Sequence, residues 1–288
     1  MAVDVRPARA ESEQLPRVVG GREAAPREWQ EWAEEPGHDL AAMDGGRAVG
    51  GIHVSIVSQT EAWLEALRVH PDAQGRGIAG RLVKEGEQLA RHYGAAVVRT
   101  AIPTHDYGAV AVAERAGYRI VARASVLEAE ISAAPAHMPY DAPVETPRSE
   151  AAPALTAFLE RTAAVTAWER LVPLGWRFRR LIPELVRGLV KDRRAAVALP
   201  AERAEAPQAA ALFAAHDAAA VVALLDGTVP GMQALLGEIA ESALERGTTR
   251  LVVFTHDPAV LRRLDAREWR PHSWCPDGLM IVEKRVAS

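Results

Sequence analysis

The sequence predicts an α/β protein in which a mixed central sheet is flanked by helices, arranged as two tandem domains of which the second is a divergent copy of the first. Strand-like and helix-like segments alternate along the chain, and their order in the first half recurs in the second half of the 288 residues. A stretch rich in proline separates the halves. We therefore expect domains at residues 1–131 and 151–288, joined by a linker at residues 132–150.

The elements of the first domain follow from local patterns. Asp44-Gly45-Gly46 is a strong turn signal and predicts a hairpin between strands at 39–43 and 48–57. Gly94 marks the end of a helix over 78–93, as glycine often does after a last turn. The other expected elements are a strand at 3–7, short helices at 11–19 and 25–35, strands at 63–69 and 95–101, a helix at 108–116, and a closing hairpin of strands at 118–123 and 126–131.

Composition narrows the class of protein. A hydrophobic content of 49% is enough for a large core, and the net charge of −4 gives no attraction to nucleic acid. Cys275 is the only cysteine, so no intrachain disulfide can form and a reducing compartment is expected. The most apolar window, 209–225, is interrupted by His216 and Asp217. We expect a soluble cytoplasmic protein without a signal peptide and without nucleic-acid or membrane partners.

The most informative segment is the turn Gln74-Gly75-Arg76-Gly77-Ile78-Ala79-Gly80, which lies between an expected strand and an expected helix. Glycines at such a turn allow backbone N–H groups to point into one concavity. The N-terminus of the following helix adds a partial positive charge. The turn therefore predicts a site for an anion, typically a phosphate.

Two familiar phosphate loops fit this turn poorly. The nucleotide-triphosphate loop needs Lys and then Ser or Thr after its six-residue frame, but Arg81 and Leu82 follow here. The dinucleotide fingerprint G-x-G-x-x-G is matched by Gly75, Gly77 and Gly80. However, residues 70–74 separate these glycines from the strand, and no acidic residue ends the next strand. A dinucleotide-binding protein therefore remains an alternative, but a disfavoured one.

A third pattern, Gln/Arg-x-x-Gly-x-Gly/Ala after a strand of the form Leu-x-Val-x-Pro, is met by Gln74, Gly77 and Ala79 after Leu67, Val69 and Pro71. With these residues the chain resembles the GNAT family of acyl-CoA-dependent N-acetyltransferases. A second family motif aligns with residues 106–118 without gaps, although Asp106 replaces the usual Asn and Ala113 the usual Tyr. The resemblance covers roughly residues 4–131.

The resemblance implies that the turn and the strand before it hold acetyl-CoA. No metal site is expected, because the histidines and Cys275 do not share a metal-ligand spacing. The implied cofactor-binding residues are Leu67, Val69, Gln74, Gly75, Arg76, Gly77, Ile78, Ala79, Gly80, Asp106 and Ala109. In the family a backbone N–H at the place of Leu67 polarises the thioester carbonyl. The acceptor is expected to be an amine of a small molecule or a peptide.

The candidate catalytic residues are Glu65, Leu67 and Tyr107. Glu65 is a candidate base for the amine, and strand alternation would put it on one face with Leu67; an exposed or salt-bridged strand carboxylate is the other interpretation. Tyr107 could protonate the leaving thiolate in place of the phenol lost at Ala113, or pack on the cofactor. The missing phenol leaves open a non-catalytic acyl-CoA-binding or sensor protein.

The second half repeats the order of elements but not the phosphate turn. The expected elements are helices at 152–168 and 178–190, strands at 195–199, 209–213 and 219–225, a helix at 231–246, a strand at 251–255, a helix at 258–266 and a strand at 279–284. At the equivalent turn, 226–231, glycines are fewer and Pro230 has no N–H. We expect one competent domain and a decayed copy, acting as a pseudo-dimeric monomer or as a homodimer.

Overall fold

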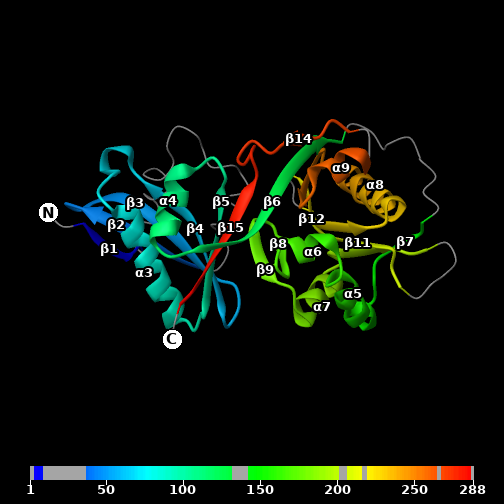
Figure 1. Cartoon of the computed structure of the whole chain (residues 1–288), viewed down its shortest axis with the longest axis horizontal. Helices are drawn as coiled ribbons and strands as arrows, with labels where there is room; N and C mark the ends of the chain where they lie inside the picture. Colours follow the sequence, from blue (N-terminus) through cyan, green and yellow to red (C-terminus); the bar gives the residue numbers. More distant parts are fainter. Residues whose placement is uncertain are drawn as a thin grey trace. The chain divides into compact units, whose positions relative to one another are not determined.

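The computed structural model describes residues 3–8, 37–131, 142–200, 206–215, 219–264 and 267–286. The chain divides into two units that are not continuous in sequence (Figure 1). Unit 1 comprises Met1–Ile102, Asp106–Ile120 and Ile281–Ser288, and unit 2 comprises Pro103–His105 and Val121–Met280. The helices expected at 11–19 and 25–35 lie outside the described residues, as do residues 132–141 of the expected linker.

Unit 1 has a mixed sheet with the strand order β1-β2-β3-β4-β5-β15. Its strands are β1 (Asp4–Pro7), β2 (Gly37–Asp44), β3 (Arg47–Ile56), β4 (Glu61–Val69), β5 (Val97–Pro103) and β15 (Leu279–Arg285). Neighbours from β1 to β4 are antiparallel, and β4 and β5 are parallel. Gly45 and Gly46 join β2 to β3 with φ of 58° and 86°, which explains the glycines of the expected hairpin.

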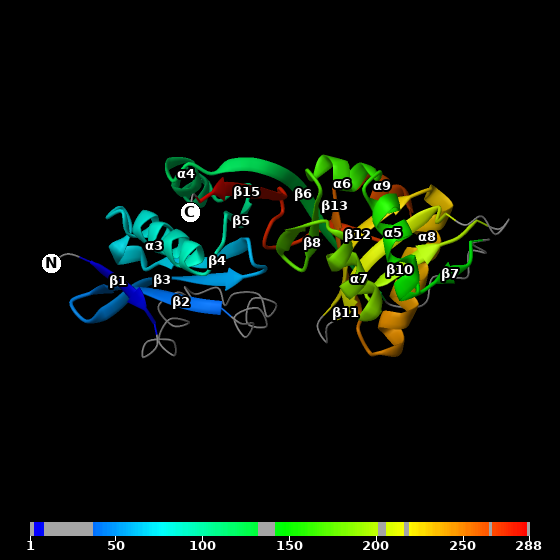
Figure 2. The same cartoon turned by 90° about the horizontal axis from the view of Figure 1, so that it is seen from below.

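Two helices of unit 1 follow its central strands: α3 (Ile78–His92) comes after β4, and α4 (Tyr107–Arg115) after β5. Helix α3 lies along one face of the sheet (Figure 2) and packs on β2, β3 and β4. At Gly86 the approach is close, because an added Cβ would lie 3.0 Å from Leu64 Cδ2. This packing fixes the N-terminus of α3 just beyond the end of β4.

The last strand, β15, is fastened into unit 1 by a buried ionic network. Arg99 of β5 is 2% exposed; its guanidinium donates to Glu61 of β4 at 2.7 Å and to Glu283 of β15 at 2.8 Å. Arg119 also donates to Glu283, at 2.9 Å. Burial alone would raise the pKa of Glu283, but the two guanidinium groups outweigh it and lower that pKa. The strand expected in a domain at 151–288 thus contributes residues 281–285 to unit 1.

Unit 2 has a sheet with the order β6-β13-β12-β11-β10-β7. Its strands are β6 (Arg119–Glu130), β7 (Val144–Glu145), β10 (Ala195–Ala198), β11 (Ala209–Ala215), β12 (Ala220–Gly227) and β13 (Arg250–Thr255), with β14 (Arg270–Pro271) paired to β6. Only β12 and β13 are parallel. Along the sheet from β7 to β13, three antiparallel pairs are followed by one parallel pair, and a helix connects the two parallel strands. Strands β1 to β5 have the same arrangement, so the second unit repeats the fold of the first.

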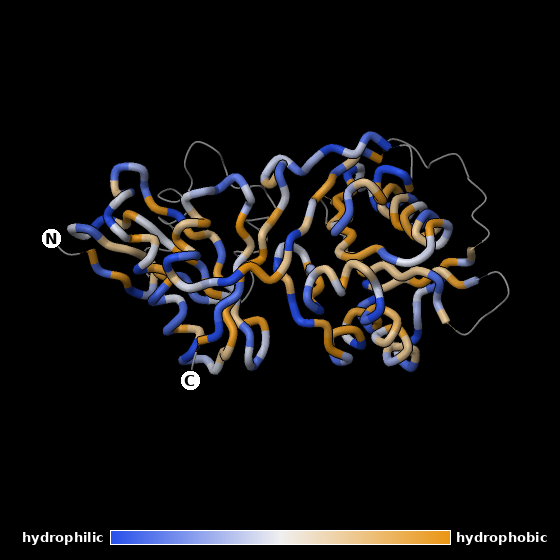
Figure 3. The backbone as a smooth tube through the Cα atoms, in the orientation of Figure 1, coloured by the Kyte–Doolittle hydropathy of each residue, from blue (hydrophilic) through white to orange (hydrophobic). Residues whose placement is uncertain are grey.

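The core of unit 2 is formed by its sheet and helix α8 (Val229–Glu245). Helix α8 packs on β10, β11 and β12, and Figure 3 shows it as largely hydrophobic. Leu235 and Leu236 of α8 are buried in one cluster with Val222 of β12 and Val253 of β13. The short helix α9 (Pro258–Leu264) adds Leu261 to the same cluster.

Three sequence-based expectations were wrong in unit 2. The helix expected over 152–168 is two helices, α5 (Ala152–Leu159) and α6 (Ala163–Ala167), because the Thr162 side chain accepts from Val165 N and begins a new helix. The segment at 178–190 starts as β9 (Arg177–Arg180), which pairs with β8 (Leu171–Leu174), and helix α7 (Pro183–Lys191) begins only at its proline.

The third is the hairpin expected at 118–131. It is one strand, β6, because β13 pairs with its residues 125–130 and takes the place of the expected partner. Within the described part of the chain, no helix has the length and apolar character needed to cross a membrane.

Candidate functional site

Strands β4 and β5 separate in the middle of unit 1. Their parallel pairing covers Glu61 to Trp63 and ends there, although β4 continues to Val69. The register between β3 and β4 also shifts after His53–Glu65, where Ala66 takes a φ of 53°. This is a β-bulge, a feature that often re-aims a strand beside an active site. In the described strands, Ala66 and Leu67 have no register partner on β3 or β5, and Leu67 lines the pocket described below.

The turn after β4 presents a run of backbone donors. The first helical hydrogen bond of α3 runs from Arg81 N to Gly77 O, at 3.2 Å. Among the described residues, none accepts a hydrogen bond from the six N–H groups of residues 75–80. Gly75 and Gly77 both have a φ of 75°, a conformation that favours glycine and lets successive N–H groups converge. Together with the α3 N-terminus, these donors form a site suited to a phosphate.

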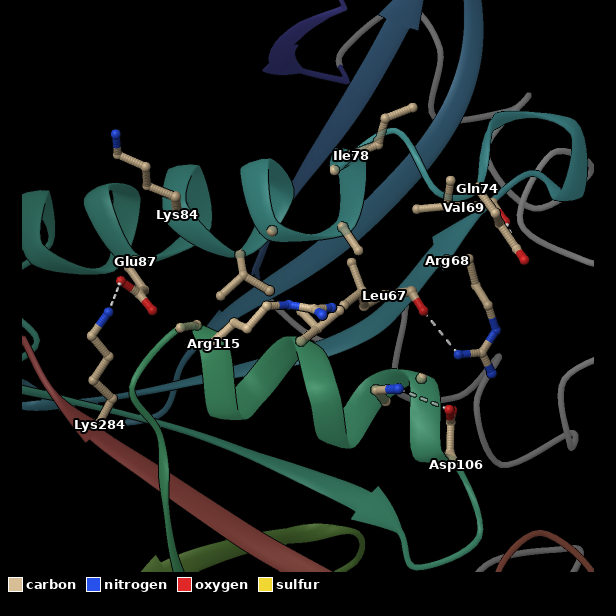
Figure 4. A pocket seen from close by; sticks show the side chains of 18 of the residues that line it. Leu67, Arg68, Val69, Gln74, Ile78, Lys84, Glu87, Asp106, Arg115 and Lys284 are labelled. Atoms are coloured by element: carbon tan, nitrogen blue, oxygen red, sulfur yellow. Dashed lines mark hydrogen bonds and ion pairs between the residues drawn. The ribbon is translucent and has the colours of Figure 1, made fainter.

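This turn opens into a pocket of about 1200 Å³ between α3 and α4 (Figure 4). The pocket is large enough for a nucleotide-sized ligand. The sequence-predicted residues that line it are Leu67, Val69, Gln74, Gly75, Gly77, Ile78, Ala79, Gly80, Asp106 and Ala109. The described residues around it contain no group of His, Cys, Asp and Glu that could hold a metal ion.

The lining is strongly basic. Its charged residues are Arg68, Lys84, Arg91, Arg115, Lys284 and Arg285 against Glu87 and Asp106. Both acids have partners, because Asp106 accepts from Ala109 N at 2.9 Å as the cap of α4, and Glu87 pairs with Lys284 at 2.7 Å. Figure 4 shows the Arg115 side chain between α3 and α4. The surplus of cations suits a ligand with several negative charges.

The comparisons with known proteins agree with this geometry. The acetyltransferase (GNAT) family model matches residues 7–118. This segment is a GNAT acetyltransferase domain. No curated protein matches the sequence.

Solved GNAT structures match both units. A GCN5-related N-acetyltransferase from Sphaerobacter thermophilus is 16% identical with a TM-score of 0.64, over 98% of this chain and 95% of that one. A tandem GNAT protein from the clavulanic acid biosynthesis pathway is 14% identical with a TM-score of 0.61, over 100% and 99%. At these identities the likeness concerns the fold, and the chain has the tandem GNAT architecture.

Three predicted residues, Arg76, Tyr107 and Glu65, do not line the pocket. Arg76 does not line it; its guanidinium binds Asp44 at 2.7 Å, and this hydrogen bond lowers the pKa of the Asp44 carboxyl. Tyr107 is 80% exposed and is also absent from the lining. Ala113 is buried, and none of the described residues that line the pocket is a tyrosine. The described part of the pocket therefore provides no phenol for the leaving thiolate.

The side chain of Glu65 is largely buried, so it is not an exposed carboxylate, whereas the salt-bridged carboxylate of the same interpretation stays open. Its side chain is 8% exposed, and its Oε1 accepts from Ser55 Oγ at 2.6 Å. His53 Nε2 lies 4.0 Å from the same oxygen. Glu65 does not line the pocket, and the bulge at Ala66 interrupts the alternation that was expected to put it on one face with Leu67.

The equivalent turn of the second GNAT-like unit is closed. Strand β12 keeps a register shift against β11, and its parallel pairing with β13 ends at Val222. However, Thr228 N donates to Gln208 O at 2.8 Å, and Gly231 N donates to Thr228 Oγ1 at 3.3 Å. Pro230 has no N–H to offer. In unit 2 the N–H groups of Thr228 and Gly231 are therefore satisfied within the protein.

Several lining residues had no signal in the sequence. Lys284 and Arg285 come from the last strand, which was expected to belong to the second domain. Glu87 and Arg115 lie on helices whose positions were predicted, but nothing in the local pattern indicates that their side chains face one pocket.

Proposed function

We propose that this chain is an N-acetyltransferase that transfers an acetyl group from acetyl-CoA to an amine of a small molecule or peptide, with the chemistry confined to unit 1. The observation that carries the proposal is the run of six backbone N–H groups at residues 75–80, which have no acceptor among the described residues and open into a basic pocket. Coenzyme A carries a diphosphate and a further phosphate, and its thioester supplies the activated acetyl group.

Each part of the pocket has a role in this reaction. The turn at 75–80 holds the diphosphate, and residues 67–69 of β4 hydrogen-bond the pantetheine arm as a neighbouring strand would. Leu67 N–H, which lies outside both strand ladders, polarises the thioester carbonyl. A donor of this kind contributes about 3 kcal/mol to transition-state stabilisation in hydrolytic enzymes. Glu65, which does not line the pocket, accepts through a water chain the proton that the attacking amine loses.

A second candidate function is a non-catalytic acyl-CoA-binding protein. The observation in its favour is that Ala113 stands in the phenol position and Tyr107 lies outside the pocket. The loss of this acid is tolerable in an enzyme, because a thiol has a pKa of about 8.5 and its thiolate leaves with help from water. We therefore rank the acetyltransferase first.

Calorimetry followed by a thiol-release assay tests the two candidates. We expect the full chain to bind CoA with micromolar affinity without binding NAD(H), and to release thiol from acetyl-CoA in the presence of at least one amine of a panel. CoA binding with no turnover supports the second candidate, and NAD(H) binding without CoA binding rejects both. Burial raises the pKa of the single cysteine, Cys275, to about 12, so the thiol reagent will report only the released CoA.

The proposal also includes the class of acceptor and the assembly state of the protein. We expect a small-molecule or peptide amine, and a monomer whose second unit takes the place of a partner subunit; a homodimer on light scattering would overturn the latter. The lone cysteine agrees with a reducing cytoplasm as the place of action.

A further inference from the structure

Three ionisable residues form a row across the middle strands of unit 1. The strand register pairs Asp39 of β2 with His53 of β3, and His53 with Glu65 of β4. His53 Nδ1 lies 2.8 Å from Asp39 Oδ1, and His53 Nε2 lies 4.0 Å from Glu65 Oε1. Ile52 and Val54, on either side of His53, face Gly86 of α3. Side chains alternate along a strand, so the row lies on the face of the sheet opposite α3.

The row contains a buried nitrogen without a partner. The side chains of His53 and Glu65 are 6% and 8% exposed, whereas Asp39 is 44% exposed. His53 Nε2 makes no hydrogen bond in the described structure. A buried polar atom without a partner is costly and calls for an explanation.

The hydrogen bond between His53 Nδ1 and Asp39 explains why His53 Nε2 has no partner. Because Asp39 accepts from Nδ1–H, the neutral ring carries its lone pair on Nε2, directed to the side where Glu65 lies. A lone pair facing a carboxylate is repulsive unless a proton lies between them. The geometry of the row therefore leaves His53 Nε2 and Glu65 Oε1 as two acceptors that face each other.

We propose that Asp39 and His53 relay the proton that Glu65 takes from the acceptor amine, an inference that rests on the proposed acetyl transfer. The amine lone pair forms the new N–C bond, the C–S bond of the thioester breaks, and the thiolate leaves with the bonding electrons. The proton released by the nitrogen passes through water to the Glu65 carboxylate, which lies outside the pocket lining, and then to His53 Nε2. The resulting imidazolium is stabilised by Asp39. Asp39 and His53 act through Glu65, so they are positioning residues.

Two neighbours hold this arrangement. Ser55 Oγ donates to Glu65 Oε1 and fixes the carboxylate beside the ring. A Cβ at Gly37 would lie 2.1 Å from His53 Nε2, so only glycine leaves room for the imidazole in its present place. The 4.0 Å gap exceeds a hydrogen bond and closes by a shift of about 1 Å, since catalytic hydrogen bonds are often long before substrate binds.

Steady-state kinetics on the full chain test the relay against a purely structural role. The variants are His53→Gln, Glu65→Gln and the double variant, with His38→Gln as the matched control. His38 also lies on β2, one residue from Asp39, and its ring stacks on Tyr93 at 4.4 Å. We expect Glu65→Gln to lower kcat about 100-fold and His53→Gln about 10-fold or more. KM for acetyl-CoA and the unfolding temperature should stay close to those of the control.

The coupling between the two changes is the decisive measurement. Because His53 acts through Glu65, the double variant should be no slower than Glu65→Gln alone, and added imidazole should restore part of the rate of His53→Ala. Losses that multiply, or a His53→Gln loss no larger than that of His38→Gln, overturn the relay. If His53→Gln fails to fold, Asp39→Asn at the half-exposed end of the row replaces it, and an unchanged kcat there also overturns the relay.

The same experiment separates failure of the relay from failure of the proposed function. If the wild-type protein is active and these substitutions do not change its rate, the acetyltransferase assignment stands and the relay is rejected. If the wild-type protein turns over no amine, the acetyltransferase assignment and the relay are both rejected, because the row then has no proton to accept.

Discussion

Lys284 Nζ lies 2.7 Å from Glu87 Oε2, which ties the last strand of the chain to the helix that carries the phosphate-binding turn. Both residues line the pocket, and Lys284 also lies over the ring of Tyr118, 5.8 Å from its centroid. Burial and the nearby Glu87 carboxylate raise the pKa of Tyr118, so its hydroxyl stays neutral beside the pair. One wall of the GNAT pocket thus depends on a strand from the far end of the sequence.

Replacing Lys284 should weaken both the fold and cofactor binding. Lys284→Met leaves the buried Glu87 carboxylate without its cation, and we expect a loss of about 1–3 kcal/mol in the free energy of unfolding and weaker CoA binding. Urea unfolding and calorimetry measure the two effects. Lys191→Met, an exposed lysine at the end of α7, is the control and should change neither quantity. Unchanged CoA affinity in Lys284→Met would show that the pair does not shape the pocket.

The buried Arg99 of the ionic network should contribute far more to the free energy of unfolding than the exposed Arg119. Arg99→Met leaves Glu61 and Glu283 buried without their shared guanidinium, and we expect it to lower the free energy of unfolding by about 3–5 kcal/mol. Arg119→Met removes a side chain that is 58% exposed, and the expected loss is below about 1 kcal/mol. Equal losses in urea unfolding would contradict this assignment.

The same network should make unit 1 sensitive to acid. The pKa of Glu283 is lower in the folded protein than its ordinary value of 4.5, so its stabilising contribution is complete above pH 4.5 and is lost as the pH falls through the folded pKa. Glu283→Gln should therefore lie below the wild type in free energy of unfolding at pH 7, and the difference should shrink as the pH falls below 4.5. A difference that is the same at every pH would show that the effect of the substitution does not come from the ionisation of Glu283.

The backbone of the turn should tolerate no side chain at Gly77. Its φ of 75° is strained for any other residue, so Gly77→Ala should lower the free energy of unfolding by about 1–2 kcal/mol and weaken CoA binding. Gly188→Ala in the middle of α7 is the matched control: an added Cβ there meets open space, and the change should stabilise the helix by about 0.5–1 kcal/mol. If both variants bind CoA equally, the turn does not hold the ligand.

Local patterns predicted those parts of the site that depend on neighbouring residues. The glycine turn, the strand before it and the hairpin at Gly45 and Gly46 were all visible in the sequence, because each requires particular residues at short spacing. The basic lining from Lys284 and Arg285 was not, because it results from pairing between distant strands.

Long-range contacts also explain the residues that were misplaced. Arg76 was expected at the ligand, and only the folded chain brings Asp44 to its side chain. The segment at Arg177–Arg180 has a composition that is neutral between helix and strand, and its pairing with β8 decides the outcome. The row of Asp39, His53 and Glu65 likewise exists only through the strand register.

The position of β15 has a consequence for biosynthesis. Most of unit 1 is translated before unit 2, yet the sheet of unit 1 includes residues 281–285. While the intervening chain is being translated, β5 presents an open edge. During that time the ion pair of Glu61 and Arg99 lacks its third member, Glu283. Nascent chains arrested before residue 279 should therefore be bound by chaperones and be unable to retain coenzyme A, even though the phosphate-binding turn was translated long before.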